Sequence, residues 1–220
     1  MHDLSRRELL GLAAIAPLAG AIASTKVVAA ARGADADEQS QARASIQRTH
    51  LPNVSLITQN GKRVRFYDDL VKDKIVTINF FFGHCDEVCP LVTANLVKVQ
   101  KLLGDCIGRD IFMYSVTLKP EEDNPDVLQK YMKKFNARPE GWTFLTGQGL
   151  DIENLRKGLG FTYPDPAIDR DKTQHIGNVR YGNEPLMLWA ACPGMAHPPF
   201  IAESISWMIR PETKTAIARG

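Results

Sequence analysis

The sequence predicts one α/β domain in which a β-hairpin precedes alternating strands and helices. Three observations lead to this fold class. An Asn60-Gly61 pair lies between two short strand-like segments, a nearly unbroken apolar run covers residues 74–82, and a second apolar run covers residues 110–118. Each apolar run is followed by a segment with helical periodicity, which is typical of a parallel strand, a crossover helix and the next strand.

The first predicted element is a hairpin with strands at residues 54–58 and 62–66. Its Asn-Gly pair tolerates the positive φ angles of a tight turn between antiparallel strands. Residues 74–82 (KIVTINFFF) have the β-branched and aromatic composition of a central strand covered on both faces. A helix is expected from Pro90 to Leu103, because proline fits the first helical turn and Gly104 ends the periodic segment.

The second half of the chain completes the pattern. Residues 110–118 predict the next strand, and Asn124 is expected to cap a helix with one apolar stripe that extends to Phe135. A short strand is expected at residues 142–145 and a short helix at 151–158. A β-rich pair is expected at residues 176–189, with its last strand over 185–189, and a terminal helix begins at Pro198. This order predicts a thioredoxin-like single domain with an N-terminal β-hairpin extension.

The N-terminus has the form of an export signal. Arg6 and Arg7 precede a moderately apolar run, which is typical of a twin-arginine signal, and an A-x-A arrangement predicts cleavage after Ala31. A retained signal would be a membrane anchor, although the run contains Pro17 and is shorter than the ~20 residues that span a bilayer core. The expected division is therefore a signal at residues 1–31, a flexible tether at 32–50 and a folded domain at 51–212. The mature chain is expected in the periplasm, with membrane contact only through an uncleaved signal or through a partner.

Composition excludes some classes of partner. The chain has 220 residues, 44% of them hydrophobic, and a formal net charge of +2. This charge gives no basic field strong enough to argue for nucleic acid. Function must therefore be sought in local sites.

The strongest such site is Cys85-Asp86-Glu87-Val88-Cys89, between the predicted central strand and the helix after it. Two cysteines at this spacing can approach to disulfide distance, and the N–H groups at a helix start favour thiolate over thiol. The pair can be a redox dithiol, a structural disulfide or two soft metal ligands. A structural disulfide is disfavoured because it would close a very short loop.

The stretch FFFGHCDEVCPL resembles the signature of the Sco/SenC family, which are copper-handling proteins with a thioredoxin fold. The stretches SVTL, KPEEDNP and LQKYMKKF further along the chain are similar to the family's second strand, the turn behind it and the next helix. The resemblance implies a copper site formed by Cys85, Cys89 and, by register, His175. It also implies a copper-accepting subunit of cytochrome c oxidase as the partner, with delivery to its dinuclear copper centre.

Three residues depart from the family pattern. Asp86 stands where the family usually has proline, Thr117 replaces an aspartate, and Gln174 replaces an acidic residue. Residues next to metal ligands orient those ligands. These three changes therefore bear on the affinity of the site for copper, on its redox potential and on the identity of the partner. The three donor residues are unchanged.

An enzyme remains the alternative to a metallochaperone. As a thiol-disulfide oxidoreductase, the protein would use Cys85 or Cys89 to attack a periplasmic target and the other cysteine to resolve the mixed disulfide, with a periplasmic thiol reductant as a further partner. Both functions can coexist if the target is reduced before it receives copper.

Further sulfur lies outside this motif. Cys106 and Cys192 are expected to be unpaired, with Cys192 on the same rim of the sheet as the Cys85–Cys89 pair and Cys106 at the opposite end. A patch of soft donors is either an auxiliary copper or redox site, or a strand end with incidental sulfur. Its members are Met187, Cys192, Met195 and His197.

Overall fold

The computed structural model describes residues 37, 38, 40–84, 88–171 and 177–209. The chain divides into two units, Met1–Ala44 and Ser45–Gly220. In the first unit the described residues are helical, and the second unit contains the sheet. None of the helices in the described part of the chain is long and apolar enough to cross a membrane.

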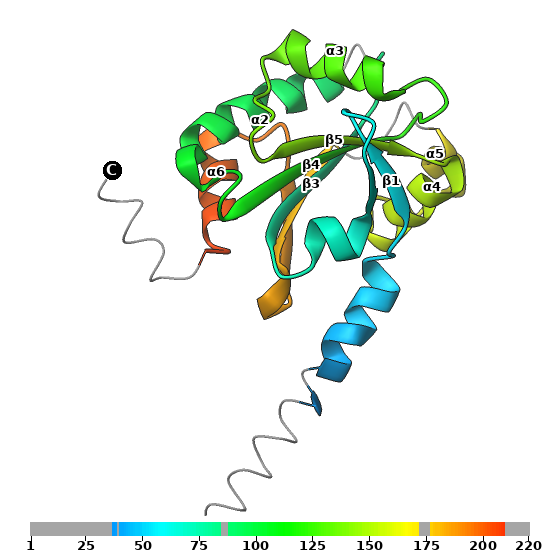
Figure 1. Cartoon of the computed structure of the whole chain (residues 1–220), viewed down its shortest axis with the longest axis vertical. Coiled ribbons are helices and arrows are strands. Elements are labelled where there is room, and N and C mark those ends of the chain that lie inside the picture. The colour runs from blue at the N-terminus through cyan, green and yellow to red at the C-terminus, as the bar shows by residue number, and fades with distance from the viewer. Residues whose placement is uncertain (1–36, 39, 85–87, 172–176, 210–220) are drawn as a thin grey trace, which may run out of the picture. The chain divides into compact units, whose positions relative to one another are not determined.

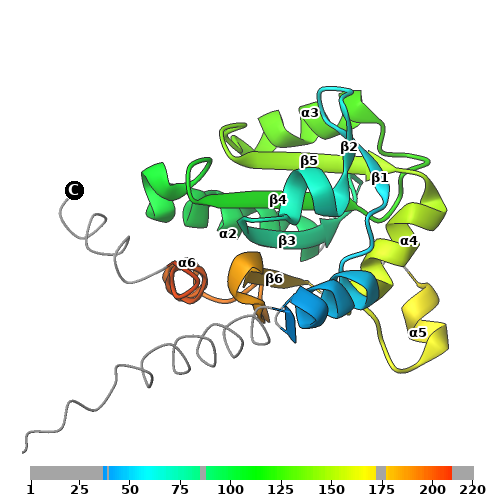
Figure 2. The same cartoon turned by 60° about the horizontal axis from the view of Figure 1, so that its bottom comes forward.

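The described strands form one mixed sheet in the order β2-β1-β5-β4-β3-β6-β7. The three central strands are parallel, and an antiparallel pair flanks them on each side. Figure 2 shows β5, β4, β3 and β6 one after another across the sheet. The strands are β1 (Ser55–Thr58), β2 (Arg63–Arg65), β3 (Ile75–Phe81), β4 (Ile111–Thr117), β5 (Trp142–Gly147), β6 (Asn178–Asn183) and β7 (Leu188–Pro193).

Helices cover this sheet on both faces. On one face α2, α3 and α6 pack over a core that contains Phe81, Leu96 and Phe144, and Figure 1 shows α2 and α3 together on that side. On the other face α4 and the short helix η1 cover a second core that contains Ile78 and Leu155. The helices are α2 (Val88–Leu103), α3 (Pro125–Phe135), α4 (Gly149–Gly158), α5 (Pro166–Arg170) and α6 (Pro198–Ser206), with short helices η1 (Phe66–Val71), η2 (Gly104–Cys106) and η4 (Glu184–Leu186).

Alternation along β3 explains why both faces are covered. Ile78 belongs to one core and Phe81 to the other, because successive side chains of a strand point to opposite faces. This confirms the expected central strand and the thioredoxin-like α/β class. The N-terminal hairpin is also confirmed: Leu56 pairs with Val64, and Gly61 has φ of 76° in the turn between them.

The last strand differs from its prediction. It begins at Leu188 and ends at Pro193, whereas residues 185–189 were expected. The chain turns first, because Asn183 caps η4 by accepting a hydrogen bond from the Leu186 N–H and Met187 has a left-handed φ of 53°. Pro185 suits the start of this turn and lacks the N–H that a strand ladder needs.

The expected tether also contains regular structure. Residues 45–50 are helical, and the Leu51 N–H donates to the Gln47 carbonyl. Ile46 lines a small cavity with Leu159 and Trp189, so an apolar side chain in this segment has a buried surface to contact. The expected boundaries at residues 31 and 50 stay predictions.

Candidate copper and dithiol site

The cysteine loop lies at the carboxyl end of β3. Cys85, Asp86 and Glu87 fall outside the described residues, whereas Cys89 lies in the first turn of α2 and is only 1% exposed. Its side chain belongs to the core on the α2 face. The sequence therefore folds here as predicted, with a buried strand, a short loop and a helix that begins beside the second cysteine.

A buried carboxylate fixes the chain just before the loop. Oδ2 of Asp123 accepts a hydrogen bond of 2.9 Å from the Gly83 N–H and another from the Thr117 hydroxyl. Asp123 lies in the turn between β4 and α3, where its own N–H donates to the Lys119 carbonyl. Thr117, which departs from the family pattern, thus contacts an acidic group that the following turn supplies. The sequence predictions gave Asp123 no role, although a polar turn after a strand end is a signal for a site.

The segment after His175 packs against the helix that follows the cysteine loop. Residues 172–176, which include His175, lie outside the described residues, but Gly177 is described. A Cβ atom at Gly177 would lie 2.8 Å from Val88 Cγ1, so the Gly177 backbone packs against the first turn of α2. The Gly194 N–H also donates to the Gly177 carbonyl at 2.8 Å, which ties this segment to the end of β7.

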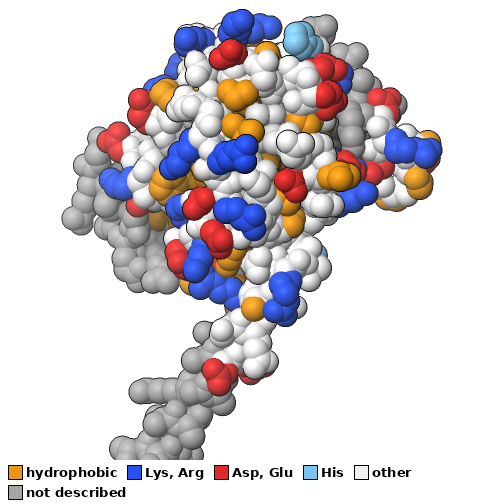
Figure 3. Space-filling model, turned by 45° about the vertical axis from the view of Figure 1, so that its right-hand side comes forward, with side chains coloured by type: hydrophobic (Ala, Val, Ile, Leu, Met, Phe, Trp, Pro, Cys, Tyr) orange, Lys and Arg blue, Asp and Glu red, His pale blue; other side chains and the backbone are white. Residues whose placement is uncertain are grey.

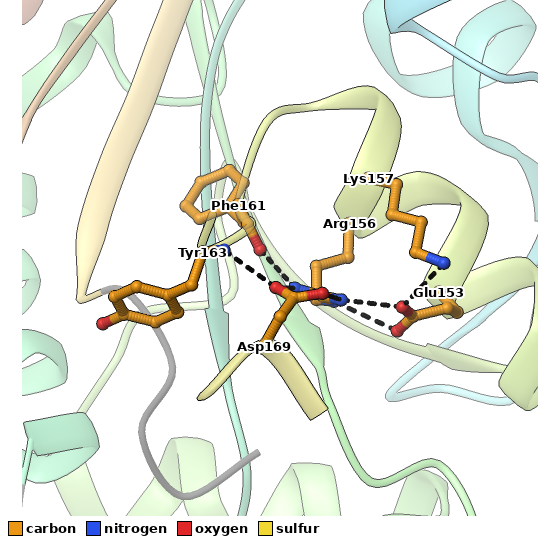
Figure 4. Close-up of polar contacts among 6 residues, drawn as sticks. All are labelled: Glu153, Arg156, Lys157, Phe161, Tyr163 and Asp169. Carbon is orange, nitrogen blue, oxygen red and sulfur yellow. Dashed lines mark hydrogen bonds and ion pairs between the residues drawn. The ribbon is translucent and has the colours of Figure 1, made fainter. Parts of the chain in front are cut away.

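An ion-pair network holds the chain before His175. The Arg156 side chain, 5% exposed, makes bidentate contacts with Asp169 at 2.7 Å and also binds Glu153 (Figure 4). These carboxylates raise the pKa of the guanidinium, Asp169 being the larger influence. Arg156 also donates to the Phe161 carbonyl, and Asp169 accepts from the Tyr163 N–H. The network thus joins α4 to α5, whose last residues lead toward residue 172.

Cys106 and Cys192 are unpaired thiols, as predicted. β6 is antiparallel to both β3 and β7, so β7 runs parallel to β3 and Cys192 lies toward the rim where β3 ends. Cys106 instead lies in η2, beyond the far end of the 16-residue α2. Burial raises the pKa of the Cys192 thiol to about 11 and also raises that of Cys106.

The patch of soft donors at the C-terminal end is divided by the fold. Met187 precedes β7 and Met195 follows it, so a whole strand separates them. Met195 and His197 line a surface groove of about 680 Å³ between α2 and the start of α6, whereas Cys192 is in the core. Within the described residues, no group of three or more His, Cys, Asp and Glu side chains lies close enough to hold a metal ion.

Surface charge shows no single-sign field on the face drawn in Figure 3, where basic and acidic side chains are interspersed. Two thiolates and an imidazole are donors that suit copper. The residue types Cys, Cys and His thus fit a copper ion by their donor chemistry.

A mixed sheet with a C-x-x-x-C motif between its central strand and the next helix defines a thioredoxin-like protein with two cysteines at a strand–helix junction. The chain belongs to the SCO1/SenC family, whose sequence profile matches residues 42–208. An SCO1 protein homolog from Bacillus subtilis is 32% identical over 89 residues, 40% of this chain and 45% of that protein. An SCO2-like protein from Rickettsia felis is 32% identical over 121 residues, 55% of this chain and 56% of that protein. The matches thus span about half the length of these relatives.

Solved structures show the same fold. An SCO1/SenC family lipoprotein from Bacillus anthracis has a TM-score of 0.59 at 24% identity and covers 70% of this chain and 92% of its own. ScoI of Bradyrhizobium japonicum, solved with copper bound, has a TM-score of 0.57 at 22% identity and covers 70% of this chain and 96% of its own. BsSco has a TM-score of 0.57 at 23% identity, covers 70% of this chain and 90% of its own, and is described as having a disulfide switch and as a member of the Sco family of cytochrome c oxidase assembly proteins.

Proposed function

We propose that this protein is a periplasmic copper metallochaperone that holds one copper ion through Cys85, Cys89 and His175. It would pass the ion to the dinuclear copper centre of cytochrome c oxidase. Membership of the SCO1/SenC family and the copper-bound ScoI structure support this function. One contact supports this set of ligands: Gly177 packs against Val88. Gly177 is two residues after His175, and Val88 is next to Cys89.

The chemistry follows from the three donors. Two thiolates and one imidazole suit both oxidation states of copper, whereas a structural zinc site usually has four protein ligands. Three protein donors leave room for an incoming ligand from the recipient, so copper can be transferred by exchange of one ligand at a time. The burial of Cys89 in the first turn of α2 would fix one sulfur while the loop before it supplies the other.

Thiol-disulfide exchange is the second candidate function. It is favoured by the position of Cys89 at a helix start and by the disulfide switch described for BsSco. One cysteine thiolate would attack a target disulfide and release one target thiolate, and the second cysteine would then displace the other. The pair ends as a disulfide, the target ends as a dithiol, and a periplasmic thiol reductant must restore the pair.

Export by the twin-arginine route would place either function in the periplasm. The paired Arg6 and Arg7 motivate this route, and the similar Bacillus anthracis protein is described as a lipoprotein, which is consistent with export. The partners we propose are a copper-accepting oxidase subunit and a thiol reductant. Nucleic acid is not proposed as a partner.

His175→Ala separates the two functions in one preparation. Copper affinity is expected to fall by at least tenfold, because imidazole is needed for coordination, while disulfide exchange with a model disulfide stays within about twofold. His197→Ala is the matched control, because this histidine is exposed in the groove beside α6. Loss of disulfide exchange with unchanged copper affinity would instead favour the enzyme.

A further inference from the structure

Asp123 is the described residue whose burial is hardest to explain by folding alone. Its side chain is 0% exposed, yet within the described part of the chain its Oδ1 atom has no hydrogen-bond partner. The other oxygen, Oδ2, accepts hydrogen bonds from the Gly83 N–H and the Thr117 hydroxyl. A buried carboxylate oxygen without a partner lowers the stability of the folded state.

The unpartnered oxygen lies against the start of the cysteine loop. A Cβ atom at Gly83 would be 2.6 Å from Oδ1, so only glycine leaves room for this carboxylate. Gly83 is two residues before Cys85. Two residues of chain span at most ~7 Å, and a hydrogen bond adds ~3 Å, so the charge lies within about 10 Å of the Cys85 backbone.

The two hydrogen bonds do not require a negative charge. An asparagine at residue 123 would accept both of them through its amide oxygen, because the donors are an N–H and a hydroxyl. Such a residue would also avoid the cost of a buried charge. What a carboxylate provides and an amide does not is a negative charge, fixed next to Gly83 at the start of the cysteine loop.

We propose that Asp123 is a positioning charge that selects Cu²⁺ over Cu⁺ at the site formed by Cys85, Cys89 and His175. This inference depends on the proposed copper function. Bound Cu²⁺ carries one more positive charge than bound Cu⁺. This difference holds for any fixed protonation state of the three ligands. A fixed anion nearby stabilises the more positive form.

The size of the effect follows from distance and screening. A copper ion on the Cys85 sulfur lies a few ångströms beyond that backbone, so the charge acts over roughly 10–15 Å. With an effective dielectric constant of about 20, one unit of charge at this distance changes the ratio of Cu²⁺ to Cu⁺ affinity by about tenfold. Asp123→Asn should therefore raise the reduction potential of the bound copper by about 60 mV, since a tenfold change corresponds to 59 mV for one electron.

The test measures Cu⁺ and Cu²⁺ affinities by competition with chelators, and the potential of the bound copper, for the native protein and three variants. Asp123→Asn removes the charge and keeps the hydrogen bonds. Asp123→Ser removes the charge with a smaller side chain and is expected to shift the ratio in the same direction, so the test holds even if the asparagine variant does not fold. Thr117→Val keeps the charge but loses the hydrogen bond that this hydroxyl donates to Asp123 and the one that it accepts from the Lys119 N–H. Its ratio of Cu²⁺ to Cu⁺ affinity is expected to stay within about twofold of native.

The outcomes separate the two proposals. A ratio shifted toward Cu⁺ in both Asp123 variants and unshifted in Thr117→Val supports the inference. An unchanged ratio in folded Asp123 variants that still bind copper overturns it and leaves the copper function intact, because Asp123 would then only hold Gly83 and Thr117. A native protein that binds no copper in either oxidation state overturns the proposed function and this inference with it.

Discussion

Replacement of Gly83 by alanine tests whether the anchor before the cysteine loop has the tight geometry described above. The new Cβ atom would lie 2.6 Å from Asp123 Oδ1 and 3.2 Å from Val127 Cγ1, whereas ordinary contacts begin at 3.4 Å. The carboxylate must therefore move by roughly 0.8 Å, which disturbs the hydrogen bonds that its other oxygen makes with Gly83 and Thr117. Overpacking and a weakened bond to a charged group together predict a loss of about 2–4 kcal/mol in the free energy of unfolding.

Urea denaturation of the reduced protein without copper measures this loss directly. Gly149→Ala is the matched control, because a Cβ atom there meets nothing within 4 Å and the residue is the first of α4. That variant is expected to be unchanged or more stable by up to about 1 kcal/mol, since alanine restricts the unfolded chain. A Gly83→Ala variant as stable as the native protein would refute the proposed close contact between Gly83 and Asp123.

Three further predictions concern other parts of the chain. Arg156→Ala should lower the free energy of unfolding by about 2–4 kcal/mol in urea denaturation, because two partly buried carboxylates lose their cation; a loss under 1 kcal/mol would contradict the role of the network. The raised pKa of Cys192 means that the folded state keeps a proton that the unfolded state loses, so this thiol's contribution to stability should fall as the pH rises from about 9 to about 11. Cys192→Ala should remove that part of the pH slope, and an identical slope in both proteins would show that Cys192 does not cause it. Replacement of Arg6 and Arg7 together by lysine should block export in cell fractionation, and normal periplasmic accumulation would point to another pathway.

The sequence was most informative where local chemistry determines structure. Asn60-Gly61 predicted the hairpin because that pair accepts positive φ, and the helix cap at Asn124 followed from its side-chain oxygen, which accepts from the Val127 N–H. The cysteine motif predicted a loop between β3 and α2 because a buried strand and a helical segment flank it. These signals lie within a few residues of one another along the chain.

Other features depend on contacts between distant segments and were missed. The role of Asp123 requires that the turn after β4 reach the end of β3, and Gly83 is 40 residues away in sequence. The approach of Gly177 to Val88 likewise depends on how β6 pairs with β3. The start of the last strand was misplaced because the left-handed turn at Met187 has no glycine to mark it.

An anaerobic copper titration of the fully reduced protein, with metal analysis, tests most directly whether one copper ion binds through two cysteines and one histidine. One copper per chain is expected at the main site, and saturation should raise the melting temperature, because a ligand at ~1,000 times its dissociation constant adds about 4 kcal/mol to stability. Cys85→Ser and Cys89→Ser should each lose most of this copper, whereas Cys106→Ser should keep it, since that thiol lies beyond the far end of α2. Full copper binding by the Cys85→Ser and Cys89→Ser variants, or a melting temperature that stoichiometric copper leaves unchanged, would contradict the account.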